Sequence, residues 1–173
     1  MINKLIYKIT YRVNNLYNKC KPFPKLRHSK PKGELDMTHI SAFNYGNAGD
    51  TLLPVVLRDL FNDTVGVRKW KGIHVFSFVT NKIVAKINRS KAMVIGGGGL
   101  FLKDTNPNDF SGWQWSCTIE QLKKIKSPIV MFAVGYNRFR GQEEFEPIFK
   151  EHLNAFVKQA SFIGIRNSGS IRK

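Results

Sequence analysis

The chain has 173 residues, of which 42% are hydrophobic, so it can bury a core of ordinary domain size and is not an intrinsically disordered chain. Its 28 Lys and Arg against 12 Asp and Glu give a formal net charge of +16, which favours an anionic partner. No apolar run approaches the roughly 20 residues that span a bilayer, and the N-terminus has no signal-peptide cleavage site. We therefore expect a cytoplasmic protein.

The first 36 residues differ in composition from the rest of the chain. Nine basic residues precede the first acidic residue, Glu34. Apolar side chains recur at steps of three and four over residues 1–20, which predicts a basic amphipathic helix, and the prolines of residues 21–36 predict a linker. Such a helix can lie peripherally on an anionic membrane through residues 1–32, or it can pack on a protein. We expect two parts: residues 1–36, and a folded domain over residues 37–173.

Within the folded domain, apolar runs alternate with helical patterns. The expected strands are residues 38–43, 73–79, 92–95, 129–134 and 162–165. The expected helices are residues 52–61, 81–88, 118–126 and 143–159, with loops at residues 62–72, 103–112 and 135–141. This alternation predicts an α/β fold: a Rossmann-like, mostly parallel sheet with helices on both faces.

The first candidate site is the turn after the first strand, residues 44–50. Gly46 and Gly49 permit positive φ and close approach by a ligand. The helix that follows offers unpaired N–H groups, which suit a phosphate or carboxylate, and Asn47 is a further candidate ligand contact. Asp50 either caps this helix, as Thr51 could, or serves as a catalytic base.

The second candidate site is a run of four glycines, Gly96, Gly97, Gly98 and Gly99, after the strand at residues 92–95. A simple turn needs one or two glycines, so the surplus favours backbone amides brought close to a ligand in a strand-to-helix turn. Close packing between strand and helix is the alternative reading. No Gly-Lys-Ser/Thr follows, which excludes a phosphate-binding P-loop.

The third candidate site follows the strand at residues 129–134. Here Gly135, Asn137, Arg138 and Arg140 form a loop whose arginines can hold a phosphate or carboxylate, or can simply be solvated. Because ligands bind beyond the carboxyl ends of parallel strands, these residues are expected to line one cleft with the other two sites.

Further residues are assigned by their position. Arg166 and Ser170 follow the last strand and are expected at the same edge of the sheet. Trp113 and Trp115 either stack on a sugar or belong to the core. Cys20 and Cys117 have no Cys or His at metal-ligand spacing, so we expect free thiols and no metal site.

Taken together, these motifs resemble the polysaccharide pyruvyl transferase family. The resemblance rests on Gly-Asn-x-Gly-Asp at residues 46–50, Val-Ile-Gly-Gly-Gly-Gly-Leu at 94–100, Val-Gly-Tyr-Asn at 134–137 and Ile-Gly-Ile-Arg-Asn-Ser-Gly-Ser-Ile at 163–171. It extends over residues 38–172. The family residues carried over to this chain are Asn47, Gly49, Asp50, Gly96, Gly97, Gly98, Gly99, Gly135, Arg166 and Ser170.

The resemblance implies transfer of a pyruvyl group from phosphoenolpyruvate to a sugar hydroxyl of a surface polysaccharide or its lipid-linked precursor, in exopolysaccharide biosynthesis. No cofactor is expected. It also implies a two-domain, glycosyltransferase-B-like architecture. Residues 37–173 would then be the N-terminal half, expected to bind acceptor but to lack turnover by itself. Two alternatives remain: half of a nucleotide-sugar glycosyltransferase, and a basic anion- or nucleic-acid-binding domain, which the concentration of charge in the leader disfavours.

Overall fold

The structure is a computed structural model that describes residues 35–43, 47–103 and 109–171. The amphipathic helix expected over residues 1–20 lies outside the described residues, as does nearly all of the linker and Gly46. Within the described part, no helix combines the length and apolar character needed to cross a membrane.

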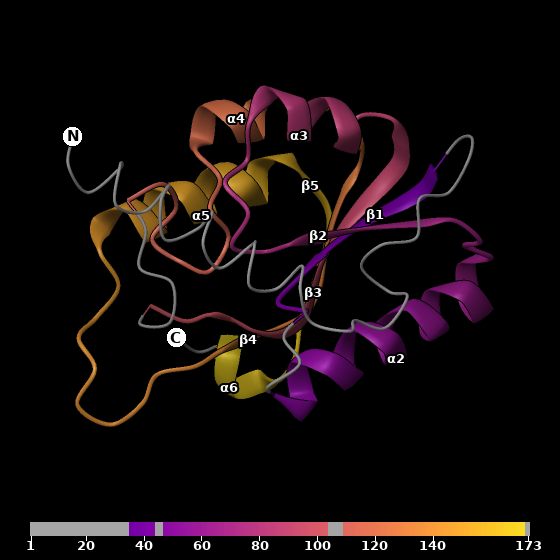
Figure 1. Cartoon of the computed structure of the whole chain (residues 1–173). Helices are drawn as coiled ribbons and strands as arrows, with labels where there is room; N and C mark the ends of the chain where they lie inside the picture. The colour runs from indigo at the N-terminus through magenta and orange to yellow at the C-terminus, as the bar shows by residue number, and fades with distance from the viewer. Residues whose placement is uncertain (1–34, 44–46, 104–108, 172–173) are drawn as a thin grey trace, which may run out of the picture.

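The described residues form one parallel sheet with helices on both faces, which confirms the predicted α/β fold (Figure 1). The strands are β1 (Leu35–Ser41), β2 (Trp70–His74), β3 (Ser90–Phe101), β4 (Ile129–Tyr136) and β5 (Ala160–Ile165), in the order β2-β1-β3-β4-β5. The helices are α2 (Ala48–Val65), α3 (Asn81–Ile87), α4 (Ile119–Lys123), α5 (Pro147–Gln159) and α6 (Ser168–Ile171).

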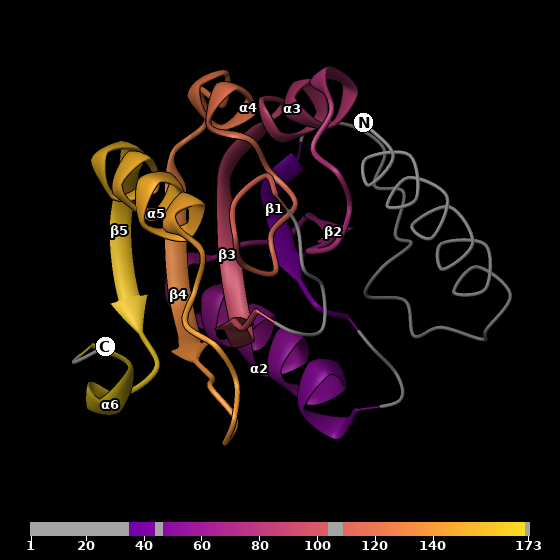
Figure 2. The same ribbon diagram turned by 90° about the vertical axis from the view of Figure 1, so that its left-hand side faces the viewer.

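Each face of the sheet buries its own apolar cluster, because side chains alternate along a strand. Helices α3, α4 and α5 cover one face, and α2 covers the other (Figures 1 and 2). On β3, Met93 and Ile95 join the larger cluster, while Val94 between them joins the cluster with Leu57 of α2. This alternation explains why the strands read as continuous apolar runs in the sequence.

Trp113 and Trp115 belong to the larger core cluster. Both are fully buried, and the Trp113 indole donates a hydrogen bond to Nδ1 of His152 at 3.1 Å. The two indoles pack edge-to-face against each other and against Phe156 of α5. The core reading of these tryptophans is therefore confirmed, and stacking on a sugar is not available to them in this conformation.

Several predicted boundaries were wrong, and the errors lie at element ends. Helix α2 begins at Ala48, four residues before the predicted start, so that Pro54 lies inside the helix and not in its first turn. It ends at Val65 and is capped by Gly66, which is left-handed with φ of 74°. Strand β2 covers residues 70–74 and not 73–79, because pairing with β1 begins at Trp70 opposite Met37.

The largest correction concerns the four glycines, which are strand and not a strand-to-helix turn. Strand β3 runs through them to Phe101, and β4 likewise includes Gly135 and Tyr136. A Cβ on Gly96 would lie 1.7 Å from the carbonyl oxygen of Phe132 in β4, so the two strands can approach this closely only at a glycine. Periodicity within one segment cannot reveal such contact with a neighbouring strand.

Candidate functional site

The strand order places a topological switch point between β1 and β3. The chain leaves β1 through α2 toward β2 on one side, and leaves β3 toward β4 on the other. In open parallel sheets, ligands bind in the crevice that this divergence leaves beyond the carboxyl ends of the strands. The connection from β1 to α2 and the glycines of β3 lie at this edge, as the sequence predicted.

At the start of α2, the helix cap is Asn47. Its side-chain oxygen accepts hydrogen bonds from the backbone N–H of Gly49 at 2.8 Å and of Asp50 at 3.4 Å. The expectation that Asp50 or Thr51 caps the helix was therefore wrong. An Asn at the N-cap satisfies backbone groups that would otherwise lack partners, and this leaves the Asp50 carboxylate available.

Asp50 lies in the first turn of α2, half-buried beside the glycine strand. A Cβ on Gly98 would come 3.9 Å from its Oδ1, so the carboxylate lies next to the backbone of β3. Among the described residues, none forms a hydrogen bond or ion pair with this carboxylate. Burial raises the pKa of Asp50 above its ordinary value. Such a carboxylate is a stronger base than an exposed one.

A second group forms where β3, β4 and β5 end. The Asn137 amide fills the space beside Gly99, 1.8 Å from where a Cβ would lie. The Arg166 guanidinium similarly lies over Gly135, with Cζ 2.5 Å from the position of a Cβ, and its Nη2 donates to Oδ1 of Asn137 at 3.3 Å. The glycines at 99 and 135 thus make room for a polar pair.

Ser170 holds α6 against the end of β4. Its hydroxyl oxygen accepts the backbone N–H of Tyr136 at 3.1 Å, and the same hydroxyl donates to Oδ1 of Asn167 at 3.0 Å. The predicted Arg-x-x-x-Ser pair therefore lies close to Gly135 and Asn137. Arg166 is exposed, and no described carboxylate forms a salt bridge with it, so its charge can meet an anion.

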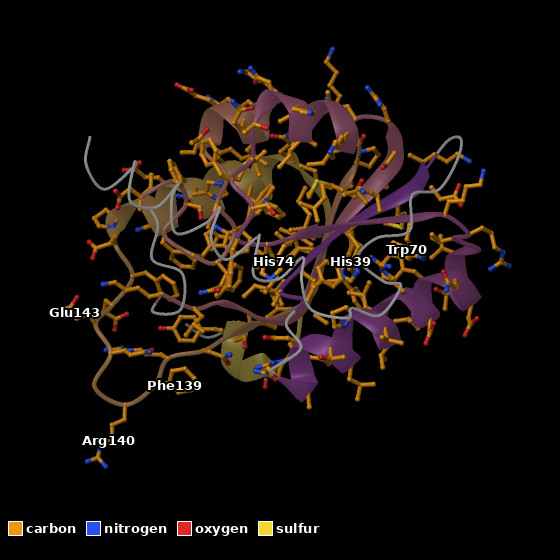
Figure 3. The ribbon with its side chains drawn as sticks, in the orientation of Figure 1. His39, Trp70, His74, Phe139, Arg140 and Glu143 are labelled. Atoms are coloured by element: carbon orange, nitrogen blue, oxygen red, sulfur yellow. The ribbon has the colours of Figure 1, made fainter. Side chains whose placement is uncertain are left out.

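Arg138 is the predicted site residue that the structure does not bring to this group. It is exposed and forms an ion pair with Glu144, and its Nε and Nη2 both donate to the carbonyl oxygen of Gln142 at 3.1 and 3.0 Å. Figure 3 shows the neighbouring Phe139 and Arg140 projecting from this loop, away from the body of the protein. Arg138 thus organises its own loop in this structure.

Sequence reasoning missed Arg58, which is buried under the switch point. Its Nε donates to Nδ1 of His39 at 3.2 Å, and Nε2 of His39 lies 3.3 Å from the carbonyl oxygen of Gly96. His39 is fully buried in the core. Arg58 lies on the buried face of α2 with Pro54 and Leu57. An arginine spaced three or four residues from apolar positions of a predicted helix was the sequence signal that could have identified it.

The side chains of this site suit anion binding and proton transfer. The described residues contain no group of three potential metal ligands. Sheet and site together define an α/β protein whose candidate ligand-binding site lies at a topological switch point. The family model for polysaccharide pyruvyl transferase matches residues 5–173, and the chain belongs to this family. The recognition made from its motifs is therefore confirmed. A comparison with curated proteins found no match.

Proposed function

We propose that this chain carries the acceptor site and part of the donor site of a pyruvyl transferase that uses phosphoenolpyruvate as donor and a sugar hydroxyl as acceptor. Family membership implies a transferase of the polysaccharide pyruvyl type. Two observations support the assignment of roles. Asp50 is a half-buried carboxylate beside Gly98 that has no hydrogen-bond or ion-pair partner among the described residues, and Arg166 is an exposed arginine whose guanidinium lies over Gly135.

Asp50 is proposed as the general base that takes the proton of the attacking hydroxyl. Its raised pKa brings it closer to the range in which a carboxylate transfers protons efficiently. Gly98 offers no side chain at this point, so a sugar hydroxyl can approach the carboxylate over the bare backbone of β3.

Arg166 and Asn137 are proposed to hold an anionic group of the reactants. The guanidinium is a fixed fork of donors that suits carboxylate and phosphate oxygens. Asn137 accepts from Nη2, which orients the fork over Gly135. The N-terminus of α2 adds a positive dipole end at the same edge.

The overall reaction balances without a cofactor. Two hydroxyl oxygens of one sugar bond to C2 of phosphoenolpyruvate, the C2–O bond to phosphate breaks, and inorganic phosphate leaves. One hydroxyl proton ends on C3, which becomes a methyl group, and the other ends on the phosphate. Asp50 acts as the carrier for one of these protons.

Ligand preference tests this assignment. Thermal-shift titration of the chain with phosphoenolpyruvate and with nucleotide sugars compares the two donor classes directly. Stabilisation by phosphoenolpyruvate alone is expected, and stabilisation by nucleotide sugars alone would favour the glycosyltransferase alternative. A steeply salt-dependent affinity for DNA or RNA would instead support the nucleic-acid reading.

We further propose that residues 1–32 bring the protein to the cytoplasmic face of an anionic membrane, where lipid-linked acceptors would be concentrated. Support comes from the charge and the periodicity of this segment. Sedimentation with anionic vesicles should be stronger for the whole chain than for a variant lacking residues 1–32, and equal sedimentation would contradict this. The second α/β domain and the boundary at residue 36 remain predictions.

A further inference from the structure

We propose that Arg58 is a positioning residue: through His39 and Phe43 it holds the ends of β1 and β3 in the geometry that the ligand edge requires. This inference rests on the proposed function, because it concerns the same edge of the sheet. Arg58 itself is only 5% exposed, so it acts through its neighbours and not by touching a bound substrate.

The contact with β3 runs through a histidine whose tautomer the hydrogen bonds define. An arginine can only donate, so the Arg58 Nε–H requires that Nδ1 of His39 be unprotonated. The proton of the neutral ring is then on Nε2, which donates to the carbonyl oxygen of Gly96. Burial, together with the nearby Arg58 charge, lowers the pKa of His39 to about 3, so the ring stays neutral at physiological pH.

The contact with the segment that follows β1 runs through aromatic packing. The Arg58 guanidinium lies over the rings of Phe43 and Trp70, with Cζ 5.5 and 5.3 Å from their centroids. The His39 ring packs edge-on against Phe43 at 5.1 Å. Figure 3 shows His39 and Trp70 together between the sheet and α2. The buried Arg58 guanidinium therefore contacts Phe43, two residues after the end of β1, and acts through His39 on Gly96, the first residue of the glycine run.

Phe43 gives this packing a direct consequence for the site. It is a non-glycine residue with φ of 39°, in the left-handed region that L side chains rarely adopt. Such a conformation persists only when the surroundings enforce it. Because Asp50 and Arg58 lie on the same helix, α2, the clamp formed by Arg58, His39 and Phe43 sets the position of Asp50 relative to the glycine strand.

The test compares Arg58→Met and Arg58→Lys with Leu57→Ala in the full chain. Methionine keeps an apolar volume, and lysine keeps the charge but lacks the planar fork and Nε–H. Leu57 neighbours Arg58 on α2 and is 4% exposed in the same core cluster, so its truncation lowers stability without touching the clamp. All measurements are made where each variant is folded.

Two readouts separate positioning from mere stability. Nitrogen-15 NMR of the His39 ring should show the Nε2–H tautomer in the parent chain and in Leu57→Ala, and both Arg58 variants should lose that pattern and shift the amides of residues 96–99. Titration with phosphoenolpyruvate should give a dissociation constant at least 10-fold weaker for both Arg58 variants, and within 2-fold of the parent for Leu57→Ala.

The inference is overturned if either Arg58 variant leaves the His39 tautomer and the amides of residues 96–99 unchanged. It is also overturned if Leu57→Ala weakens phosphoenolpyruvate binding as much as Arg58→Met does. If the parent chain does not bind phosphoenolpyruvate, the proposed function fails, and the NMR comparison, which needs no ligand, still decides the role of Arg58.

Discussion

Two substitutions in β3, Gly96→Ala and Gly98→Ala, should distinguish a glycine that folding requires from a glycine that leaves room for a ligand. A Cβ at Gly96 would lie 1.7 Å from the Phe132 carbonyl oxygen, where real Cβ atoms stay at 3.0 Å or more. At Gly98 the nearest atoms are Leu100 Cδ2 at 3.8 Å and Asp50 Oδ1 at 3.9 Å, which are ordinary contacts.

These distances set the expected free energies of unfolding. Gly96→Ala must push β3 and β4 apart by more than an ångström, since the shortfall is 1.3 Å. Overpacking costs about 1–3 kcal/mol, and one or two weakened ladder hydrogen bonds add about 1 kcal/mol each, for a total of about 4 kcal/mol. Gly98→Ala meets no clash and gains up to about 0.5–1 kcal/mol, because alanine has less freedom in the unfolded chain.

Urea denaturation followed by tryptophan fluorescence measures both variants, because Trp70, Trp113 and Trp115 are all buried. With a slope of about 2 kcal/mol per molar urea, the midpoint of Gly96→Ala should fall by about 2 M. The midpoint of Gly98→Ala should be unchanged or higher. The same change in an enzyme that turns over should lower activity, because the added methyl group lies beside Asp50. A loss under about 1 kcal/mol for Gly96→Ala, or equal losses for both, would refute this reasoning.

Three further predictions concern single residues. Asp50→Asn in an enzyme that turns over should lower phosphate release about 100-fold or more, with stability nearly unchanged, and full activity would remove Asp50 from the mechanism. His39 has a folded pKa of about 3 against an ordinary 6.5, so its contribution to stability is complete above pH 6.5 and is lost as the pH falls toward 3. Urea denaturation at several pH values measures this. Between pH 6 and 4, the free energy of unfolding should depend on pH less steeply in His39→Gln than in the parent chain, by about 1.4 kcal/mol per pH unit. Gly66→Ala should lower the free energy of unfolding by about 1 kcal/mol through backbone strain alone, because its φ is 74° and nothing lies within 4 Å of the added Cβ; a matched Thr64→Ala change should cost less.

The local pattern of the chain was sufficient for the fold class. Strands such as residues 129–134 were predicted because a strand buried on both faces has to be apolar throughout, and that requirement is written in consecutive residues. The grouping of Asp50, the glycine run and Arg166 at one edge was also predictable. Parallel strands align their carboxyl ends, so residues that follow different strands share an edge.

Other features depended on the backbone geometry of a single turn, or on contacts between segments far apart in the chain. Asn47 and Asp50 are both good helix caps, and only the backbone geometry decided that Asn47 takes this role. The four glycines had the composition of a turn, but the approach of Phe132 on β4 made Gly96 part of a strand.

The sequence by itself thus determined the layered α/β architecture, the family and the residues that gather at the switch point, because periodicity and motif order are local properties. Only the tertiary structure decided which of those residues caps a helix, which is left without a partner and which is buried. It assigned capping to Asn47, left Asp50 unpaired within the described residues and buried Arg58 beneath the site. Which side chain forms which hydrogen bond, and which is buried, depends on backbone geometry and on packing between elements, and residue spacing alone does not specify either.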